Sequence, residues 1–212
     1  MCGRFYIQCM DVDELRKIIE EIERHSKEIG EEAKVKLGEI FPTDVVPVIA
    51  NDKNSQPTPS LMKWGFAKPD GKGVIINARS ETVFEKAMFR SAMTNHRCLV
   101  PAVHYFEWAK KGSQRIKYAI KTEGDPIIFM AAIYRFEKAS NVPVFTILTK
   151  APTENIAFIH DRMPVLVPRE LHREWLASGG DPQKVLLQAA NARIVYQEVK
   201  EKANVPVQTT FL

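Results

Sequence analysis

The sequence CLVPAVHYFEW, residues 98–108, gives the strongest indication of the fold. It is the longest of eight short apolar runs that are separated by Pro, Gly and Asn. Their lengths and their content of β-branched residues are typical of β-strands. The other seven runs cover residues 45–49, 61–66, 74–77, 118–122, 127–134, 144–149 and 163–167. From residue 45 onward the chain is therefore expected to form mostly short strands.

A helix is expected over residues 11–29, ahead of the strand-rich part. Its apolar residues recur near the 3.6-residue period of an α-helix, with charged residues between them. They are Val12, Leu15, Ile18, Ile19, Ile22 and Ile29. Asp11 and Asp13 are candidate caps of its first turn, and Gly30 is a candidate stop. Further helices are predicted at residues 80–94, 152–159, 168–178 and 181–190.

These elements predict an α+β fold. The sequence contains no internal repeat, no low-complexity tract and no linker long enough to separate two domains. We therefore expect one domain, residues 1–212, in which mostly antiparallel sheets form a barrel-like core with flanking helices.

Composition indicates a globular protein with a sizeable core. Of the 212 residues, 45% are apolar and 26% are charged. No apolar run approaches the roughly 18 residues that a membrane span needs, and the N-terminus lacks the pattern of a secretory signal. Three cysteines are too few and too scattered for a disulfide framework, which favours a reducing, cytoplasmic location.

Charge is distributed unevenly around a net value of +4. Residues 11–36 carry nine acids and six bases, whereas residues 60–120 carry eleven bases and four acids. A basic middle segment is a possible footprint for a polyanion such as nucleic acid. Solvated lysines on an ordinary surface would give the same count.

Cys2 is a candidate nucleophile. Initiator methionine is normally removed before a small residue, which would give the mature chain an amine and a thiol on one residue. Their reference pKa values are about 7.7–8.0 and 8.5, so both nucleophilic forms exist near neutral pH. The amine attacks an aldehyde to give an imine, and the neighbouring thiol closes a thiazolidine ring with a high effective molarity. Chance or simple burial would also explain a cysteine at this position.

Several short motifs occur in a fixed order along the chain. They are MCGRF (1–5), FPT (41–43), WGF (64–66), IINARSET (75–82), RCLVPA (97–102), YFEW (105–108) and IHDRMPV (159–165). In sequence and order they resemble the SOS-response-associated peptidase (SRAP) family, over residues 2 to about 175.

The resemblance implies a function and a site. Family members capture the ring-opened sugar of an abasic site in single-stranded DNA as a thiazolidine crosslink that protects the lesion. The family is also described as peptidase-like, because the residue before the cysteine can be removed autocatalytically, and a lyase activity is a further possibility. The implied partner is single-stranded DNA, bound by a monomer that acts in the cytoplasm or on the nucleoid.

The same resemblance assigns roles to individual residues. Cys2 is the nucleophile, and Asn77 positions its amine. Glu107 handles protons and stabilises the iminium, and His160 acts as the acid that opens the sugar ring. Three arginines are expected to face DNA phosphates: Arg4, Arg79 and Arg162.

The residue types by themselves leave other interpretations open. Glu107 lies between two aromatic residues and is expected to be partly buried, as a proton-transfer group or as the partner of an arginine. Asn77 is a candidate cap for a helix starting near Ser80. His160 is a candidate core histidine. Arg79 and Arg162 are also candidate ion-pair partners of Glu81 and Asp161.

No cofactor is expected. The chain has no HExxH or CxxC motif, which argues against a zinc site, and no Walker or GxGxxG motif, which argues against a nucleotide. Cys9 and Cys98 are expected to be buried small residues.

Two features depart from the family pattern: residues 67–73 lack the aromatic residues that often follow the WGF motif, and His104 stands where glycine is common. We expect His104 to narrow the approach to Glu107 or to titrate near it.

Two other functions remain open for these residues. A peptidase acting in trans would use the same thiol, amine and acid–base groups without a phosphate-binding face. A non-catalytic module for single-stranded DNA would not need Cys2 at all.

Overall fold

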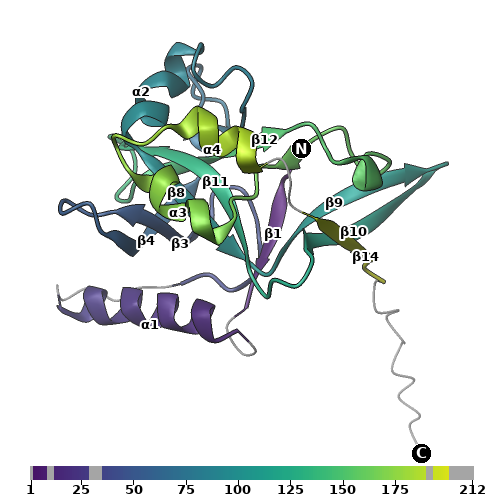
Figure 1. The fold of residues 1–212 in the computed structure, drawn as a ribbon, viewed down its shortest axis with the longest axis horizontal. Coiled ribbons are helices and arrows are strands. Elements are labelled where there is room, and N and C mark those ends of the chain that lie inside the picture. Colours follow the sequence, from purple (N-terminus) through teal and green to yellow (C-terminus); the bar gives the residue numbers. More distant parts are fainter. Residues whose placement is uncertain (1, 9–11, 29–34, 190–192, 201–212) are drawn as a thin grey trace, which may run out of the picture.

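The computed structural model describes residues 2–8, 12–28, 35–189 and 193–200. Two β-sheets form the body of the protein, and β1 lies between the ring-shaped sheet and the long β9–β10 hairpin (Figure 1). This mostly antiparallel α+β architecture confirms the predicted fold class. No helix within the described ranges is long and apolar enough to cross a membrane.

The first sheet has five strands, and every neighbouring pair is antiparallel. In spatial order its strands are β14 (Ile194–Glu198), β10 (Gln114–Thr122), β9 (His104–Lys111), β1 (Arg4–Ile7) and β2 (Gly38–Ile40). Phe5 is paired with Tyr105, so the N-terminal segment is hydrogen-bonded directly to the strand that carries Glu107.

The second sheet closes into a ring, because its first strand also pairs with its fifth. The ring consists of β11 (Ile128–Arg135), β8 (Arg97–Ala102), β3 (Val45–Asn51), β4 (Pro57–Trp64) and β12 (Val144–Lys150). Two short strands extend β12: β7 (Asn77–Arg79) and β13 (Met163–Pro164). A separate hairpin joins β5 (Phe66–Ala67) to β6 (Val74–Ile75). The closed ring is the barrel-like core that the sequence predicts.

The decisive stretch, residues 98–108, forms two strands that belong to different sheets. β8 is buried on both faces inside the ring, whereas β9 joins the five-stranded sheet. The break falls at Val103, whose backbone N–H donates to the carbonyl of Tyr6 in β1 at 2.8 Å. A single strand over this stretch, as the apolar run suggests, is therefore wrong, and the bend at Val103 links the two sheets.

Four α-helices and two 3₁₀-helices lie around the sheets in the described part of the chain. They are α1 (Asp13–Glu28), α2 (Ala87–Asn95), η1 (Glu154–Ile156), η2 (Arg169–Leu171), α3 (His172–Leu176) and α4 (Pro182–Gln188). The apolar stripe of α1 is buried against β3 and β4, as its periodicity predicts. Asp181 caps α4 by accepting hydrogen bonds from Gln183 and Lys184.

Three of the other four helix predictions are too long, whereas α4 matches the one at residues 181–190, whose last residue lies outside the described ranges. Residues 80–86 form turns, so α2 begins seven residues later than expected. Residues 152–159 contain only η1, and residues 168–178 divide into η2 and α3. Strands β1, β2 and β14 lie outside the predicted runs, because they are only three to five residues long.

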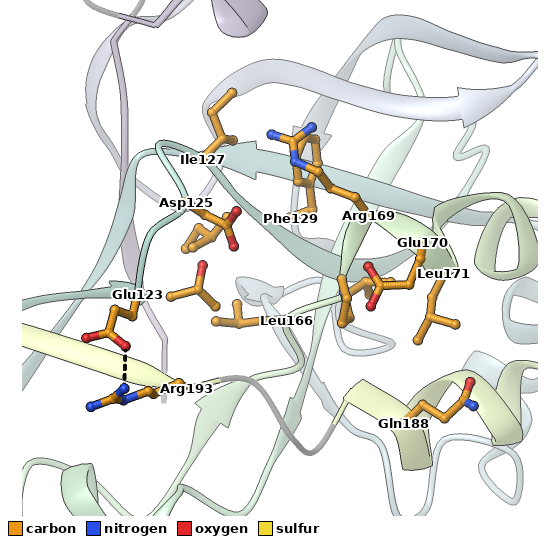
Figure 2. Close-up of a pocket in the computed structure, with 14 residues that line it drawn as sticks. Glu123, Asp125, Ile127, Phe129, Leu166, Arg169, Glu170, Leu171, Gln188 and Arg193 are labelled. Atoms are coloured by element: carbon orange, nitrogen blue, oxygen red, sulfur yellow. Dashed lines mark ion pairs between the residues drawn. The ribbon is translucent and has the colours of Figure 1, made fainter.

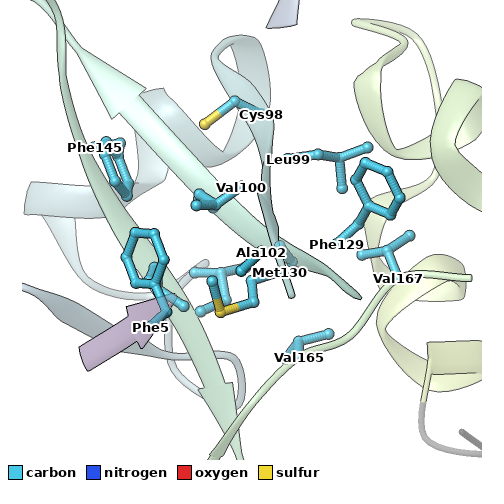
Figure 3. Close-up of a cluster of buried hydrophobic side chains, with 14 of the residues drawn as sticks. Phe5, Cys98, Leu99, Val100, Ala102, Phe129, Met130, Phe145, Val165 and Val167 are labelled. Atoms are coloured by element: carbon cyan, nitrogen blue, oxygen red, sulfur yellow. The ribbon is translucent and has the colours of Figure 1, made fainter. Parts of the chain in front are cut away.

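The hydrophobic core fills the ring and the space between it and β1. Figure 3 shows Phe5 from β1 close to Val100, Met130 and Phe145 of the ring. Cys98 is fully buried here, as predicted, whereas Cys9 lies outside the described residues. The N-terminal segment is thus fixed by packing as well as by strand pairing.

Candidate active site around Cys2

Cys2 lies immediately before β1 and is fully buried. Its Sγ is 3.8 Å from the carbonyl oxygen of Arg4. Burial raises the pKa of the thiol far above its usual range, and the negative charge of Glu107 raises it further. In this state the sulfur is therefore protonated at neutral pH.

Asn77 holds the backbone of Cys2. Its Nδ2 donates a 2.9 Å hydrogen bond to the Cys2 carbonyl oxygen. β7 carries Asn77 and is fixed in parallel register on β12, opposite Ile147. The Oδ1 of Asn77 is buried and has no hydrogen-bond partner among the described residues. Because α2 begins only at Ala87, the interpretation of Asn77 as a helix cap is wrong.

Glu107 and Tyr105 lie on the same face of β9, two residues apart. Only 4% of Glu107 is exposed, and Tyr105 is fully buried. The hydroxyl oxygen of Tyr105 has no hydrogen-bond partner among the described residues. Burial, followed by the charges of Cys2 and Glu107, raises the pKa of Tyr105 well above its usual value. Cys2, Tyr105 and Glu107 are thus close enough to influence one another electrostatically.

His160 follows η1 and is held through its Nδ1. That atom lies 2.7 Å from Oδ1 of Asp161 and accepts a 3.0 Å hydrogen bond from the backbone N–H of Arg162. The side chain is partly exposed, so His160 is not a buried core histidine. The hydrogen bond from the Arg162 N–H fixes the orientation of the ring, and the Asp161 carboxylate lies beside the same nitrogen.

The three predicted phosphate ligands lie in two places. Arg162 forms a two-pronged ion pair with Glu81, at 2.7 and 2.8 Å, and donates to the Thr149 carbonyl at 2.6 Å. The ion-pair interpretation thus applies to Arg162, with Glu81 as the partner in place of Asp161. Arg79 is exposed on β7, opposite the same Thr149 in the strand register.

Arg4 lies instead on the outer face of the five-stranded sheet, within a group of cations and aromatic rings. Its Nη1 donates to Glu39 at 2.9 Å, and its guanidinium is 4.1 Å from the centre of the Phe41 ring and 5.5 Å from that of Trp108. The Lys117 ammonium is 3.8 Å from the centre of the Phe106 ring. With Arg115 over the Trp108 ring, this face gathers Arg4 and two basic residues of the middle segment, Arg115 and Lys117, around aromatic side chains.

His104 belongs to this outer face, not to the face of Glu107. Its ring stacks on Tyr6 at 5.1 Å with an interplanar angle of 2°. Burial, with Lys121 and Lys117 nearby, lowers the pKa of His104 to about 4. The expectation that His104 narrows the approach to Glu107 is therefore wrong, because residues three apart on a strand point to opposite faces.

Comparison with known proteins identifies the family. The family model described as SOS response associated peptidase (SRAP) matches residues 1–206. The chain belongs to the SRAP family. This SRAP chain is 33% identical over 183 residues to abasic site processing protein YedK of Escherichia coli, covering 83% of this chain and 79% of YedK. It is 31% identical to abasic site processing protein YoqW of Bacillus subtilis, with 83% and 80% covered.

Other matches are more partial or concern the fold alone. Abasic site processing protein YoaM of Bacillus subtilis is 32% identical, but the match covers 65% of this SRAP chain and 64% of YoaM, slightly under two thirds of that relative's length. A crystal structure of a Bordetella bronchiseptica protein superposes with a TM-score of 0.74 at 20% identity, covering 94% of this chain and 100% of the other. This last likeness supports the SRAP fold.

The candidate site also has an aromatic border that no sequence motif indicated. Tyr118 pairs directly opposite Glu107 in the β9–β10 register, so the two side chains share a face. Its ring contacts Phe158 at 5.8 Å and Tyr196 at 5.7 Å, and these two rings are 5.4 Å apart. Phe158 is 55% exposed and Tyr196 is 43% exposed. Strand register and loop packing bring the three together, and no local pattern signals it.

A cavity of about 580 Å³ lies elsewhere in the SRAP fold. It opens between the β10–β11 turn, the segment around η2, and Gln188 of α4 (Figure 2). An ion pair of 2.9 Å between Glu123 and Arg193 crosses its edge. None of Cys2, Asn77, Glu107 and His160 is among its lining residues, so the cavity is separate from the candidate site.

Proposed function

We propose that this chain processes abasic sites in single-stranded DNA by forming a covalent crosslink through Cys2. The observation that carries the proposal is the contact between Asn77 and Cys2 beside the buried Glu107, in a chain of the family to which curated abasic site processing proteins belong. Bond formation requires the α-amine of Cys2, so the reactive form is the chain without Met1.

The chemistry proceeds in two balanced steps. The Cys2 amine attacks the aldehyde carbon of the opened sugar, and loss of one water leaves a C=N bond. The thiol then adds across this bond: sulfur bonds to carbon, and the thiol proton ends on nitrogen. Because burial raises the pKa of the thiol, its proton needs a nearby acceptor, and Glu107 is the buried carboxylate beside it.

The other site residues support these steps. Asn77 orients the amine by holding the Cys2 carbonyl. The negative charge of Glu107 stabilises the iminium that forms after loss of water. His160 donates the proton that opens the sugar ring, and Asp161 keeps its ring oriented. Removal of Met1 by the chain itself, which the family description as a peptidase suggests, would use the same thiol.

DNA binding is proposed to use both groups of arginines. Arg79 offers its guanidinium group to phosphates, whereas a phosphate at Arg4 has to share that side chain with Glu39 and one at Arg162 with Glu81. The exposed rings of Phe158 and Tyr196 offer stacking surfaces for unpaired bases, which replaces the aromatic residues absent from residues 67–73. We expect a monomer that acts on DNA in the cytoplasm.

The test is intact-mass analysis and a denaturing gel after incubation with single-stranded DNA that carries one abasic site. The wild-type chain should lack Met1 and form an adduct one water lighter than the sum of its parts. Cys2→Ala should give no heat-stable adduct, whereas the matched variant Cys98→Ala should retain it, because Cys98 lies within the ring. Undiminished stable adduct with Cys2→Ala would refute the proposal.

A further inference from the structure

The site contains one polar atom that the proposed chemistry does not use. The Tyr105 hydroxyl is buried, and its oxygen has no hydrogen-bond partner among the described residues. A buried polar group without a partner costs free energy, so such a group in a folded protein calls for an explanation. The ring itself packs well in the core beside Phe5, and a phenylalanine would fill the same space.

The position of this hydroxyl points to a ligand. Tyr105 precedes Glu107 by two residues on the same strand face, and Phe5 of the segment that follows Cys2 is paired directly opposite Tyr105. Asn77 Oδ1, next to the Cys2 backbone, is a second buried polar atom without a partner among the described residues. Two buried polar groups without partners thus lie around one nucleophile.

We propose that the Tyr105 hydroxyl binds a hydroxyl oxygen of the opened sugar and so selects hydroxylated aldehydes over simple ones. This inference rests on the proposed function. When the sugar ring of an abasic site opens, its former ring oxygen becomes a hydroxyl group on C4′, close to the aldehyde carbon. A hydrogen bond from Tyr105 holds that oxygen while the Cys2 amine attacks, which keeps the ring open and the carbonyl in reach.

The test compares Tyr105→Phe with wild type on two substrates and in thermal unfolding. With abasic single-stranded DNA, the variant should form adduct about tenfold more slowly, as expected for the loss of one hydrogen bond. With acetaldehyde, which lacks a hydroxyl group, its rate should be unchanged. Its Tm should rise by about 2–4 °C, because the buried hydroxyl without a partner is gone. Tyr134→Phe on β11 is the matched control and should change none of the rates.

Each alternative result overturns the inference in a recognisable way. Equal rates for Tyr105→Phe and wild type on abasic DNA exclude a substrate contact. Equal slowing on both substrates shows that Tyr105 acts through Cys2 or Glu107. A lower Tm shows that the hydroxyl supports the fold. A wild-type chain that reacts with acetaldehyde but not with abasic DNA refutes the proposed function, and this inference fails with it.

Discussion

The side-chain amide of Asn77 donates a 2.9 Å hydrogen bond to the carbonyl oxygen of Cys2, across 75 residues of sequence. This bond connects β7, which is paired with β12 of the ring, to the segment that leads into β1 of the five-stranded sheet. The candidate nucleophile is thus held between the two sheets. Substitutions that weaken this connection should affect reaction with abasic DNA more than they affect folding.

Asn77→Ala should slow adduct formation about five- to tenfold, because it removes one hydrogen bond that orients Cys2. The free energy of unfolding should fall by only about 1 kcal/mol. Single-turnover adduct formation and urea unfolding measure the two effects. Asn141→Ala, in an exposed turn, is the control and should alter neither. Equal rates for Asn77→Ala and wild type would remove Asn77 from the mechanism.

Arg97→Met should destabilise the protein by about 3–5 kcal/mol without a specific effect on the site. The buried guanidinium donates to the carbonyls of Met93 and Trp175, both at 2.6 Å, and further to Thr94 and Ala177. Its removal leaves several buried carbonyls without partners. Chemical denaturation measures the change, and the exposed Arg173→Met should stay within about 0.5 kcal/mol of wild type.

Arg4→Gln and Arg79→Gln should each weaken noncovalent binding of single-stranded DNA and flatten its salt dependence. The slope of log K against log salt should become shallower by about 0.7 for each phosphate that is no longer neutralised, through counterion release. Binding is measured with an abasic analogue that has no aldehyde, from low to physiological salt. Arg24→Gln, on the exposed side of α1, should leave the slope unchanged. An unchanged slope for Arg4→Gln and Arg79→Gln would place the DNA elsewhere.

Phe158→Ala should weaken binding of unpaired DNA by about 1–3 kcal/mol, because it removes the most exposed ring beside Tyr118 and Tyr196. The weakening should be smaller for fully duplex DNA, whose bases are already stacked. Fluorescence anisotropy with both forms measures the difference. Phe136→Ala, 73% exposed at the end of β11, is the matched control. Equal weakening on duplex DNA would argue against stacking.

The lowered pKa of His104 predicts that the stability of the protein depends on pH. Its folded-state pKa of about 4 lies below the usual histidine value of 6.5, so between these values the unfolded chain binds a proton that the folded chain does not. Stability should therefore fall as pH drops from 6.5 toward 4, by about 1–2 kcal/mol after solvent screening. Thermal unfolding at about pH 7 and about pH 4.5 should show a smaller decrease for His104→Gln than for wild type. His25→Gln, on exposed α1, should keep the full decrease.

Local sequence patterns predicted the elements whose burial can be read from their own residues. The apolar stripe of α1 indicated its length and its buried face, because a 3.6-residue period needs only one apolar surface to pack against. The eight runs marked most of the ring, since strands buried on both faces are continuously apolar. Strands β1, β2 and β14 were not predicted, because a strand of only three to five residues carries little signal in the sequence.

Alternation along a strand explains one error. His104 and Glu107 are three residues apart on β9, which places their side chains on opposite faces. The spacing of three residues was visible in the sequence, and it is sufficient to place the two side chains on opposite faces of one strand.

Sequence patterns were enough to establish the fold class, the helix α1, the positions of most strands, and the motifs that mark Cys2, Asn77, Glu107 and His160. The folded structure was needed to show that residues 98–108 bend between two sheets, that Arg162 pairs with Glu81, and that Tyr105 buries a hydroxyl beside the nucleophile. These features depend on residues that are far apart along the chain. Periodicity reports which side of an element is buried, whereas strand register and ring closure decide which distant side chains meet there.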